Sequence, residues 1–190
     1  MGEIIKRGYI SVCVIILAAL FTAPCAQDEL SVRLKLPEQL KKETLPQFSA
    51  RDMNGENIFV RRHLERMVEP ETKRVALLFF ATWCMPCAQG AAAVKKARSE
   101  LKENGVQAIF VNVGEKDVEA IHRWVGQYGD STLPLIMDNR SQMAGAFGLL
   151  EPNGKIIMPK ILVLNDKLKP LFLLGTEGSD FPQLLWEHNP

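Results

Sequence analysis

Two cysteines separated by two residues, Cys84 and Cys87, are the side chains of this sequence best suited to covalent chemistry. They follow an apolar run at residues 75–80 and stand where a helix is expected to begin. The thiolate, rather than the thiol, attacks disulfides, and the unpaired N–H groups at a helix N-terminus favour that negative charge. Because this spacing also lets the two sulfurs meet within one helical turn, the pair predicts thiol–disulfide exchange, with Cys84 exposed at the start of the helix.

The elements that must hold the cysteines alternate between strand and helix. Residues 75–80 are apolar throughout, which is typical of a strand buried on both faces. Apolar residues at three- and four-residue spacing then predict a helix over residues 84–103, ended by Gly105. The same patterns predict, in order, a strand at 106–113, a helix at 115–128, a strand at 133–137, a short helix at 141–147, strands at 161–164 and 171–174, and a last helix from residue 179 or 180.

A turn signal further upstream adds two more strands. Asn54 and Gly55 separate short strand-like runs at residues 48–50 and 58–60, a pattern that favours a β-hairpin. Strands alternating with helices, followed by an antiparallel pair and a closing helix, indicate an α/β fold. We therefore expect a mixed central sheet flanked by helices, with an N-terminal β-hairpin.

Composition places the chain among ordinary globular proteins. It has 190 residues, of which 47% are hydrophobic and 24% are charged, and its formal net charge is +1. Those values argue against disorder and against a protein with many membrane spans. The charges of both signs are spread along the chain, so we expect no nucleic-acid partner.

The first residues have the pattern of an export signal. Lys6 and Arg7 precede a run without charge at residues 10–23, and small residues border it at 23–26. The run is shorter than the roughly 20 residues that a membrane-spanning helix needs. Residues 1–26 are therefore predicted to be an export signal, with an uncleaved membrane anchor as the alternative.

The N-terminal pattern also predicts location and domain limits. We expect an exported protein of the periplasm, either released or held at the inner membrane by residues 8–26 or by a lipid on Cys25. Residues 27–44 carry several charges without a sustained period and are predicted to be a spacer. The folded domain is then expected over residues 45–190.

The motifs resemble one known group of proteins. Residues 73–87 resemble the active-site strand and helix of thioredoxin-like proteins, and residues 111–115, 133–138 and 159–166 resemble the exported TlpA/ResA branch of the redoxin (AhpC/TSA) superfamily. The resemblance covers about residues 45–185. It implies the thioredoxin-like fold and a protein-disulfide reductase with a redox-active Cys84–Cys87 disulfide and no cofactor.

The resemblance also implies roles for individual residues. Cys84 would attack a substrate disulfide, and Cys87 would resolve the mixed disulfide that results. Pro159 would be the cis-proline facing the pair, with Pro134 as the competing candidate, since X–Pro bonds are the common site of cis peptides. Met158 would then offer its backbone to an extended substrate.

Residues next to the cysteines complete the expected substrate surface. Trp83 would shield Cys84 and line that surface together with Met85 and Pro86. The partners implied are disulfide-containing exported proteins and a membrane thiol–disulfide electron donor, in work that includes cytochrome c assembly. We expect the protein to act as a monomer.

Three departures from the family pattern are visible. Thioredoxins have a buried Asp six residues before the first cysteine, where this chain has Leu78. Residues 88–93 lack the Glu and the helix-kinking Pro of many relatives, which leaves Gly90 as the expected weak point of the helix. The segment at residues 150–158 is longer than expected and should turn at residues 152–154.

Other functions fit the sequence less well. A zinc site needs further ligands, and the three histidines are not near a second cysteine pair, so no metal is expected. A peroxiredoxin would have Thr and Pro where this chain has Ala81 and Leu77. The alternative from another class is a thioredoxin-like binding or scaffold domain with a static disulfide.

Overall fold

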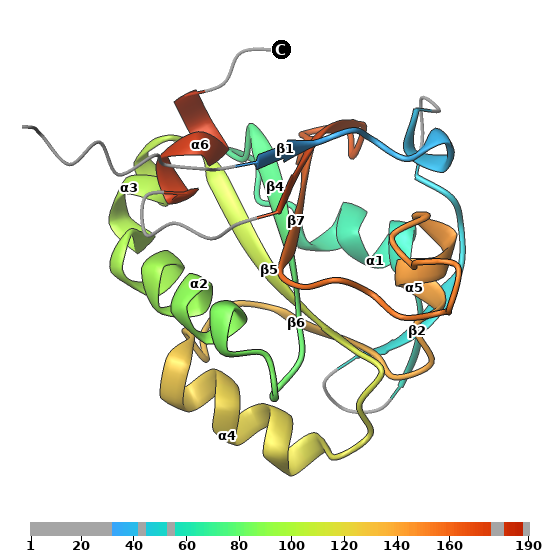
Figure 1. The fold of residues 1–190 in the computed structure, drawn as a ribbon. Helices are drawn as coiled ribbons and strands as arrows, with labels where there is room; N and C mark the ends of the chain where they lie inside the picture. Colours follow the sequence, from blue (N-terminus) through green and yellow to red (C-terminus); the bar gives the residue numbers. More distant parts are fainter. Residues whose placement is uncertain (1–31, 42–44, 53–55, 176–180, 188–190) are drawn as a thin grey trace, which may run out of the picture.

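The computed structural model describes residues 32–41, 45–52, 56–175 and 181–187. These residues form one eight-stranded mixed sheet with helices on both faces (Figure 1), as the sequence predicts. The predicted export segment at residues 1–26 and the turn at Asn54 and Gly55 lie outside the described residues. None of the helices in the described ranges combines the length and the apolar character that crossing a bilayer requires.

The sheet has the strand order β1-β8-β7-β4-β5-β6-β2-β3. Its strands are β1 (Val32–Leu34), β2 (Ser49–Asp52), β3 (Asn57–Phe59), β4 (Arg74–Phe80), β5 (Val106–Val113), β6 (Leu135–Asp138), β7 (Lys160–Asn165) and β8 (Pro170–Gly175). Strands β4, β5 and β6 are parallel, whereas the other neighbours are antiparallel. Strand β4 lies between β5 and β7, and its residues from Val75 to Phe80 are all buried, which confirms the predicted buried strand.

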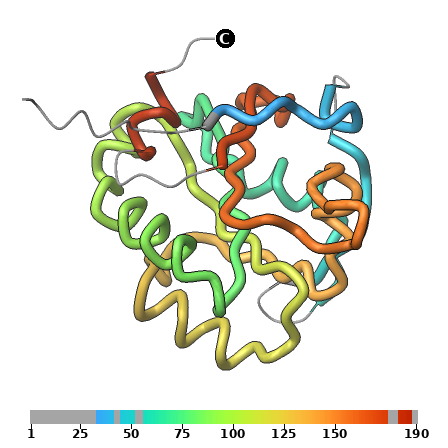
Figure 2. The backbone as a smooth tube through the Cα atoms, in the orientation of Figure 1, coloured from blue at the N-terminus to red at the C-terminus, as the bar shows by residue number. Residues whose placement is uncertain are grey.

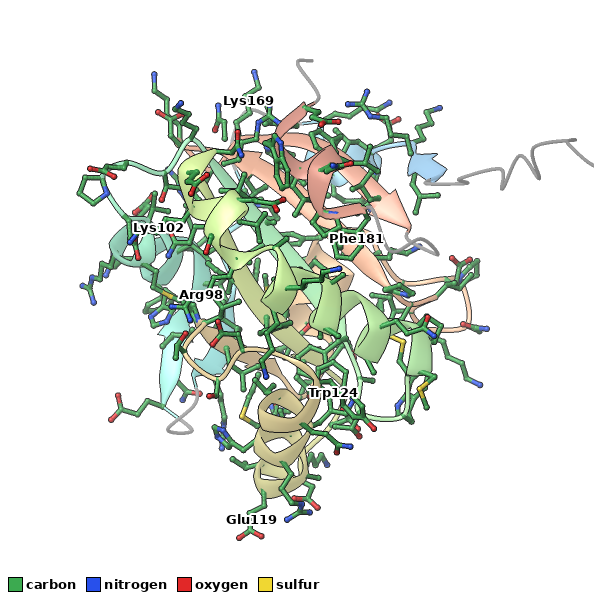
Figure 3. All side chains as sticks on the ribbon, turned by 90° about the vertical axis from the view of Figure 1, so that its left-hand side faces the viewer. Arg98, Lys102, Glu119, Trp124, Lys169 and Phe181 are labelled. Carbon is green, nitrogen blue, oxygen red and sulfur yellow. A yellow bond between two sulfur atoms is a disulfide. The ribbon has the colours of Figure 1, made fainter. Side chains whose placement is uncertain are left out.

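The helices cover the two faces of the sheet unequally. They are α1 (Val60–Met67), α2 (Met85–Lys96), α3 (Arg98–Glu103), α4 (Val118–Tyr128), α5 (Gln142–Ala146) and α6 (Phe181–Glu187). Helices α2, α3, α4 and α6 pack on one face, and α1 and α5 pack on the other. Successive strand residues point to opposite faces, so Phe80 joins the first core and Phe79 joins the second. In the first core, the Trp124 ring stacks on Phe80 with 4.3 Å between ring centroids; Figure 3 shows Trp124 on α4 in this helical layer.

Part of the predicted spacer belongs to the sheet. Strand β1 pairs with β8 at the sheet edge (Figure 2), and Arg33 lies 4.8 Å from the centre of the Phe172 ring. After β1, a short 3-10 helix at Glu38–Leu40 buries Leu40 in the second core. Three strand residues are too few to show a period, and β1 is fixed by backbone pairing with a strand from the other end of the chain.

Helix α1 was not expected from the sequence. The second strand of the hairpin ends at Phe59, so Val60 opens the helix instead of closing the strand. Val60 and Leu64 are its two fully buried residues, and charged residues fill most of the positions between and after them. With so few apolar positions, the helical period is hard to recognise in the sequence.

The predicted helix at residues 84–103 is two helices, and its break is not at Gly90. Helix α2 runs without interruption through Gly90 and ends at Lys96. Ala97, with dihedral angles outside the helical range (φ −86°, ψ 10°), is the C-cap of α2 and the N-cap of α3. The change of direction at Ala97 lets α3 bury Leu101 against the sheet. A Cβ atom at Gly90 would meet Phe181 at 3.6 Å, which is ordinary van der Waals contact.

Replacing Gly90 by alanine is therefore expected to stabilise the protein. Alanine gains about 0.5–1 kcal/mol over glycine inside a helix because it restricts the unfolded chain, and no neighbour has to move. Urea unfolding of the wild type and of Gly90→Ala measures the difference. Gly105→Ala is the control, because Gly105 has a φ of +70° and its Cβ would lie 3.0 Å from Lys73 Cγ. That variant should lose stability, and a loss in Gly90→Ala as well would contradict the account of α2.

Candidate active site at the start of helix α2

The two cysteines are joined at the N-terminus of α2. Cys84 is the N-cap residue, with extended dihedral angles (φ −87°, ψ 101°), and its Sγ accepts a hydrogen bond from the Cys87 N–H at 3.2 Å. The Cys84–Cys87 disulfide is formed, with 5.2 Å between the Cα atoms. The two sulfurs thus meet within the first turn of the helix, as the two-residue spacing of the cysteines predicts.

A tight turn carries the chain from β4 to the first cysteine. The Cys84 N–H donates to the Ala81 carbonyl at 3.0 Å, so Thr82 and Trp83 occupy the two central positions of the turn. Pro86 lies in the first turn of α2, where a missing N–H leaves no hydrogen bond unmade. The end of β4 therefore determines where Cys84 is placed.

The prediction that Cys84 is exposed is wrong for the disulfide form. Cys84 is 4% exposed, the same fraction as Cys87. Its neighbours Trp83 and Met85 are 71% and 64% exposed and form the outer surface on either side of it. The N-cap position turns the Cys84 sulfur inward toward Cys87, so apolar side chains rather than the sulfur face the solvent.

The proline expected to face the pair is next to it. The Met158–Pro159 bond is the one cis peptide bond among the described residues, so Pro134 is not the cis-proline. Pro159 and Cys87 line the same small apolar pocket between α2 and the sheet. Met158 is half-buried and packs against both cores, whereas Ile157 before it is 61% exposed.

The segment before this proline folds back on itself. Leu150 and Ile156 form an isolated antiparallel bridge, and the Gly154 N–H donates to the Glu151 carbonyl at 2.8 Å. The turn expected at residues 152–154 is therefore present. This small loop leads directly to the exposed Ile157 and then to the cis-proline.

The interior behind Cys87 is apolar. The pocket is lined, apart from the cysteine, by Leu78, Phe79, Phe80, Gly90, Ala91, Phe110, Pro159, Ile161 and Phe181. Leu78, at the position of the missing Asp, is 6% exposed. No titratable side chain other than Cys87 is among these described residues. Across the part of the chain that the structure describes, no group of three or more His, Cys, Asp and Glu side chains could hold a metal ion.

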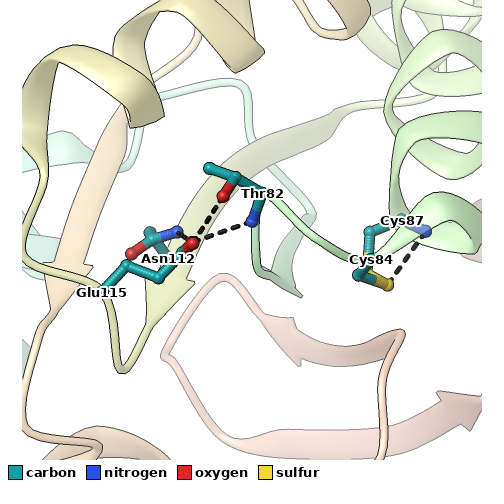
Figure 4. Close-up of a disulfide and its surroundings, with 5 residues drawn as sticks. All are labelled: Thr82, Cys84, Cys87, Asn112 and Glu115. Carbon is teal, nitrogen blue, oxygen red and sulfur yellow. Dashed lines mark hydrogen bonds between the residues drawn. A yellow bond between two sulfur atoms is a disulfide. The ribbon is translucent and has the colours of Figure 1, made fainter.

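One acidic residue that the sequence analysis did not single out contacts the turn that carries Cys84. Glu115 accepts hydrogen bonds from the Thr82 N–H (2.8 Å) and hydroxyl (2.5 Å) and from Asn112 Nδ2 (2.6 Å) (Figure 4). The run at residues 111–115 was noticed for its resemblance to the TlpA/ResA branch. Its spacing along the chain gave no sign that this carboxylate reaches the active-site turn.

Comparison with known proteins agrees with this geometry. The AhpC/TSA family profile matches residues 42–169, which is more than half of the chain. This chain belongs to the AhpC/TSA family. Within the family, the chain is similar to proteins named thiol-disulfide oxidoreductase ResA.

Two such relatives and one solved structure illustrate the similarity. The protein from Bacillus subtilis is 29% identical over 120 residues, which are 59% of this chain and 62% of the relative. The protein from Halalkalibacterium halodurans is 34% identical over 102 residues, or 54% and 53% of the two chains. The chain thus spans less than two thirds of the length of either relative. A thioredoxin-like protein from Aeropyrum pernix matches with a TM-score of 0.56 and 16% identity, covering 73% of this chain and 87% of that one, and shows the shared thioredoxin-like fold.

Proposed function

We propose that the protein is a thiol–disulfide oxidoreductase of the cell envelope that reduces disulfides in exported proteins. The observation that carries this proposal is the Cys84–Cys87 disulfide at the N-terminus of α2, beside the cis bond at Pro159. The exposed Trp83 and Met85 give a client protein an apolar surface next to the sulfurs. The similarity to relatives named thiol-disulfide oxidoreductase supports the same activity.

The proposed reaction begins with the reduced pair. The Cys84 thiolate attacks one sulfur of the client disulfide, forming a mixed disulfide and releasing the other client sulfur as a thiolate. The Cys87 thiolate then attacks the Cys84 sulfur, which breaks the mixed disulfide and releases the second client thiolate. Two electrons have passed to the client, and the protein is left with the Cys84–Cys87 bond seen in the structure.

The substrate contacts follow from the surroundings of the pair. Trp83, Met85 and Pro86 are exposed around Cys84, and Met158 would present its backbone to an extended client segment beside Pro159. A client approaching Cys84 meets these apolar groups first, because the sulfur faces inward. The proposed clients are exported proteins with disulfides, including those of cytochrome c assembly.

The N-terminal pattern supports the proposed location. Residues 1–26 are proposed to direct export to the periplasm, with the inner membrane as the place of attachment if residues 8–26 or a lipid on Cys25 hold the protein there. A membrane thiol–disulfide donor would then return the pair to the dithiol state after each cycle. No nucleic acid takes part in this scheme, and a monomer suffices for it.

Disulfide reduction requires Cys84, and insulin reduction tests this. With dithiothreitol as electron source, the wild-type protein should speed the precipitation of reduced insulin, and Cys84→Ser should fall to the uncatalysed rate, because it lacks the attacking thiolate. Equal rates at background for both proteins would favour a scaffold domain with a static disulfide.

The direction of electron flow can be tested separately. Stabilising the reduced form makes such a protein an oxidant, and the two residues between the cysteines, Met85 and Pro86, include no His to stabilise a thiolate. We therefore expect a reducing protein. Equilibration with glutathione should give a potential well below the about −120 mV of a strong periplasmic oxidant, and a value near −120 mV would overturn the assignment as a reductant.

A further inference from the structure

The carboxylate of Glu115 joins two parts of the molecule that are far apart in the sequence. Its Oε2 atom accepts hydrogen bonds from the Thr82 N–H and from Asn112 Nδ2, and its Oε1 atom accepts one from the Thr82 hydroxyl. Thr82 belongs to the turn that follows β4, and Asn112 belongs to β5. One side chain thus connects the two segments through three hydrogen bonds.

The side of the link that faces the sheet is firmly held. Asn112 is fully buried and pairs in the sheet with Phe80, the last residue of β4. Gly114 has a φ of +79°, a conformation that favours glycine, and its N–H donates to the Asp138 carbonyl of β6 at 3.0 Å. The backbone up to Gly114 is thus anchored to the sheet, and Glu115 follows directly from this anchored end.

The other side of the link is the turn that carries the reactive pair. Thr82 is the second residue of the turn closed by the hydrogen bond from Cys84 to Ala81, and Cys84 follows two residues later. Trp83, between them, is mostly exposed and packs little against the protein. The bonds from Thr82 to Glu115 are therefore the polar contacts that tie the centre of this turn to the sheet (Figure 4).

We propose that Glu115 is a positioning residue for Cys84, which holds the Ala81–Cys84 turn so that the Cys84 sulfur stays within reach of Cys87. In the disulfide the covalent bond itself restrains the turn. In the dithiol form, the hydrogen bonds from Thr82 to Glu115 restrain the turn in place of the covalent bond. By keeping the two thiols close together, they raise the effective concentration of one thiol toward the other. Loss of the link lets the dithiol form gain freedom, and the equilibrium moves away from the disulfide.

Two substitutions separate position from charge. Glu115→Ala removes all three hydrogen bonds, and we expect the equilibrium constant for disulfide formation against glutathione to fall about tenfold, as for the loss of about 1.4 kcal/mol. Glu115→Gln removes the charge but can keep the geometry. Its carbonyl oxygen can accept from the Thr82 N–H and Asn112, and its NH₂ can donate to the Thr82 hydroxyl, which is both donor and acceptor. Glu115→Gln should therefore stay within about twofold of the wild type.

A matched control is available on the next helix. Glu119 has a side chain that is 88% exposed and lies 3.7 Å from Arg123 on the outer side of α4 (Figure 3). Glu119→Ala should leave the glutathione equilibrium unchanged. An unchanged equilibrium in Glu115→Ala would overturn the proposal. A shift in Glu115→Gln as large as in Glu115→Ala would also overturn it, because the charge rather than the position would then be responsible.

A second variant, Thr82→Val, tests the same link in a smaller way. If Glu115→Ala does not fold, Thr82→Val takes its place, because it removes the hydroxyl bond to Glu115 and keeps the backbone bond. We then expect a smaller fall in the equilibrium constant for disulfide formation, and no change would overturn the proposal.

The role of Glu115 in client reduction rests on the proposed function, but the glutathione equilibrium needs no client. A wild type that forms its disulfide normally and fails to reduce insulin would refute that function alone.

Discussion

The site depends on the two pairings of strand β4. On one side β4 runs antiparallel to β7, with Phe79 opposite Lys160, so Pro159 arrives at the end of β4 where the chain turns toward Cys84. On the other side β4 runs parallel to β5, with Phe80 opposite Asn112, so Glu115 arrives at the same end. The cysteine turn, the cis-proline and the carboxylate come from three separate parts of the chain. The register of one buried strand brings them together.

Packing on the two faces of the sheet keeps that register. A shift by one residue would exchange the faces of Phe79 and Phe80, so that neither core would keep the ring that fills it. The same packing explains the apolar surroundings of Cys87, because Leu78 and Phe110 point into the helical layer that covers the pair. An ionised acid at position 78 would be buried there without a partner, which is costly. Leu78 therefore favours a stable apolar core, whereas an acid at the same position would serve as a proton relay at the expense of stability.

Much of this arrangement is visible in the sequence because it is local. The apolar run of β4, the strand at residues 106–113 and the cysteine spacing each depend on neighbours along the chain, and the structure has them where the patterns predict. The features that escaped prediction depend on distant partners. Strand β1 exists because β8, from the other end of the chain, offers it an edge. Helix α2 ends at Lys96, and α3 then packs Leu101 against the sheet. Cys84 is buried because it lies in the core on the helical face of the sheet. The bonds of Glu115 to Thr82 belong to the same class, since 33 residues separate the partners.

The central claim is that Cys84 attacks and Cys87 resolves, and a trapped intermediate tests it most directly. Reduced Cys87→Ala protein, incubated with oxidised insulin, should accumulate a mixed disulfide that peptide mapping by mass spectrometry locates on Cys84, because the neighbouring Cys87 thiol that would release the client is missing. Reduced Cys84→Ala protein should accumulate none, since Cys87 faces the apolar pocket beside Pro159. Adducts on Cys87 alone, or none in either variant, would contradict the account.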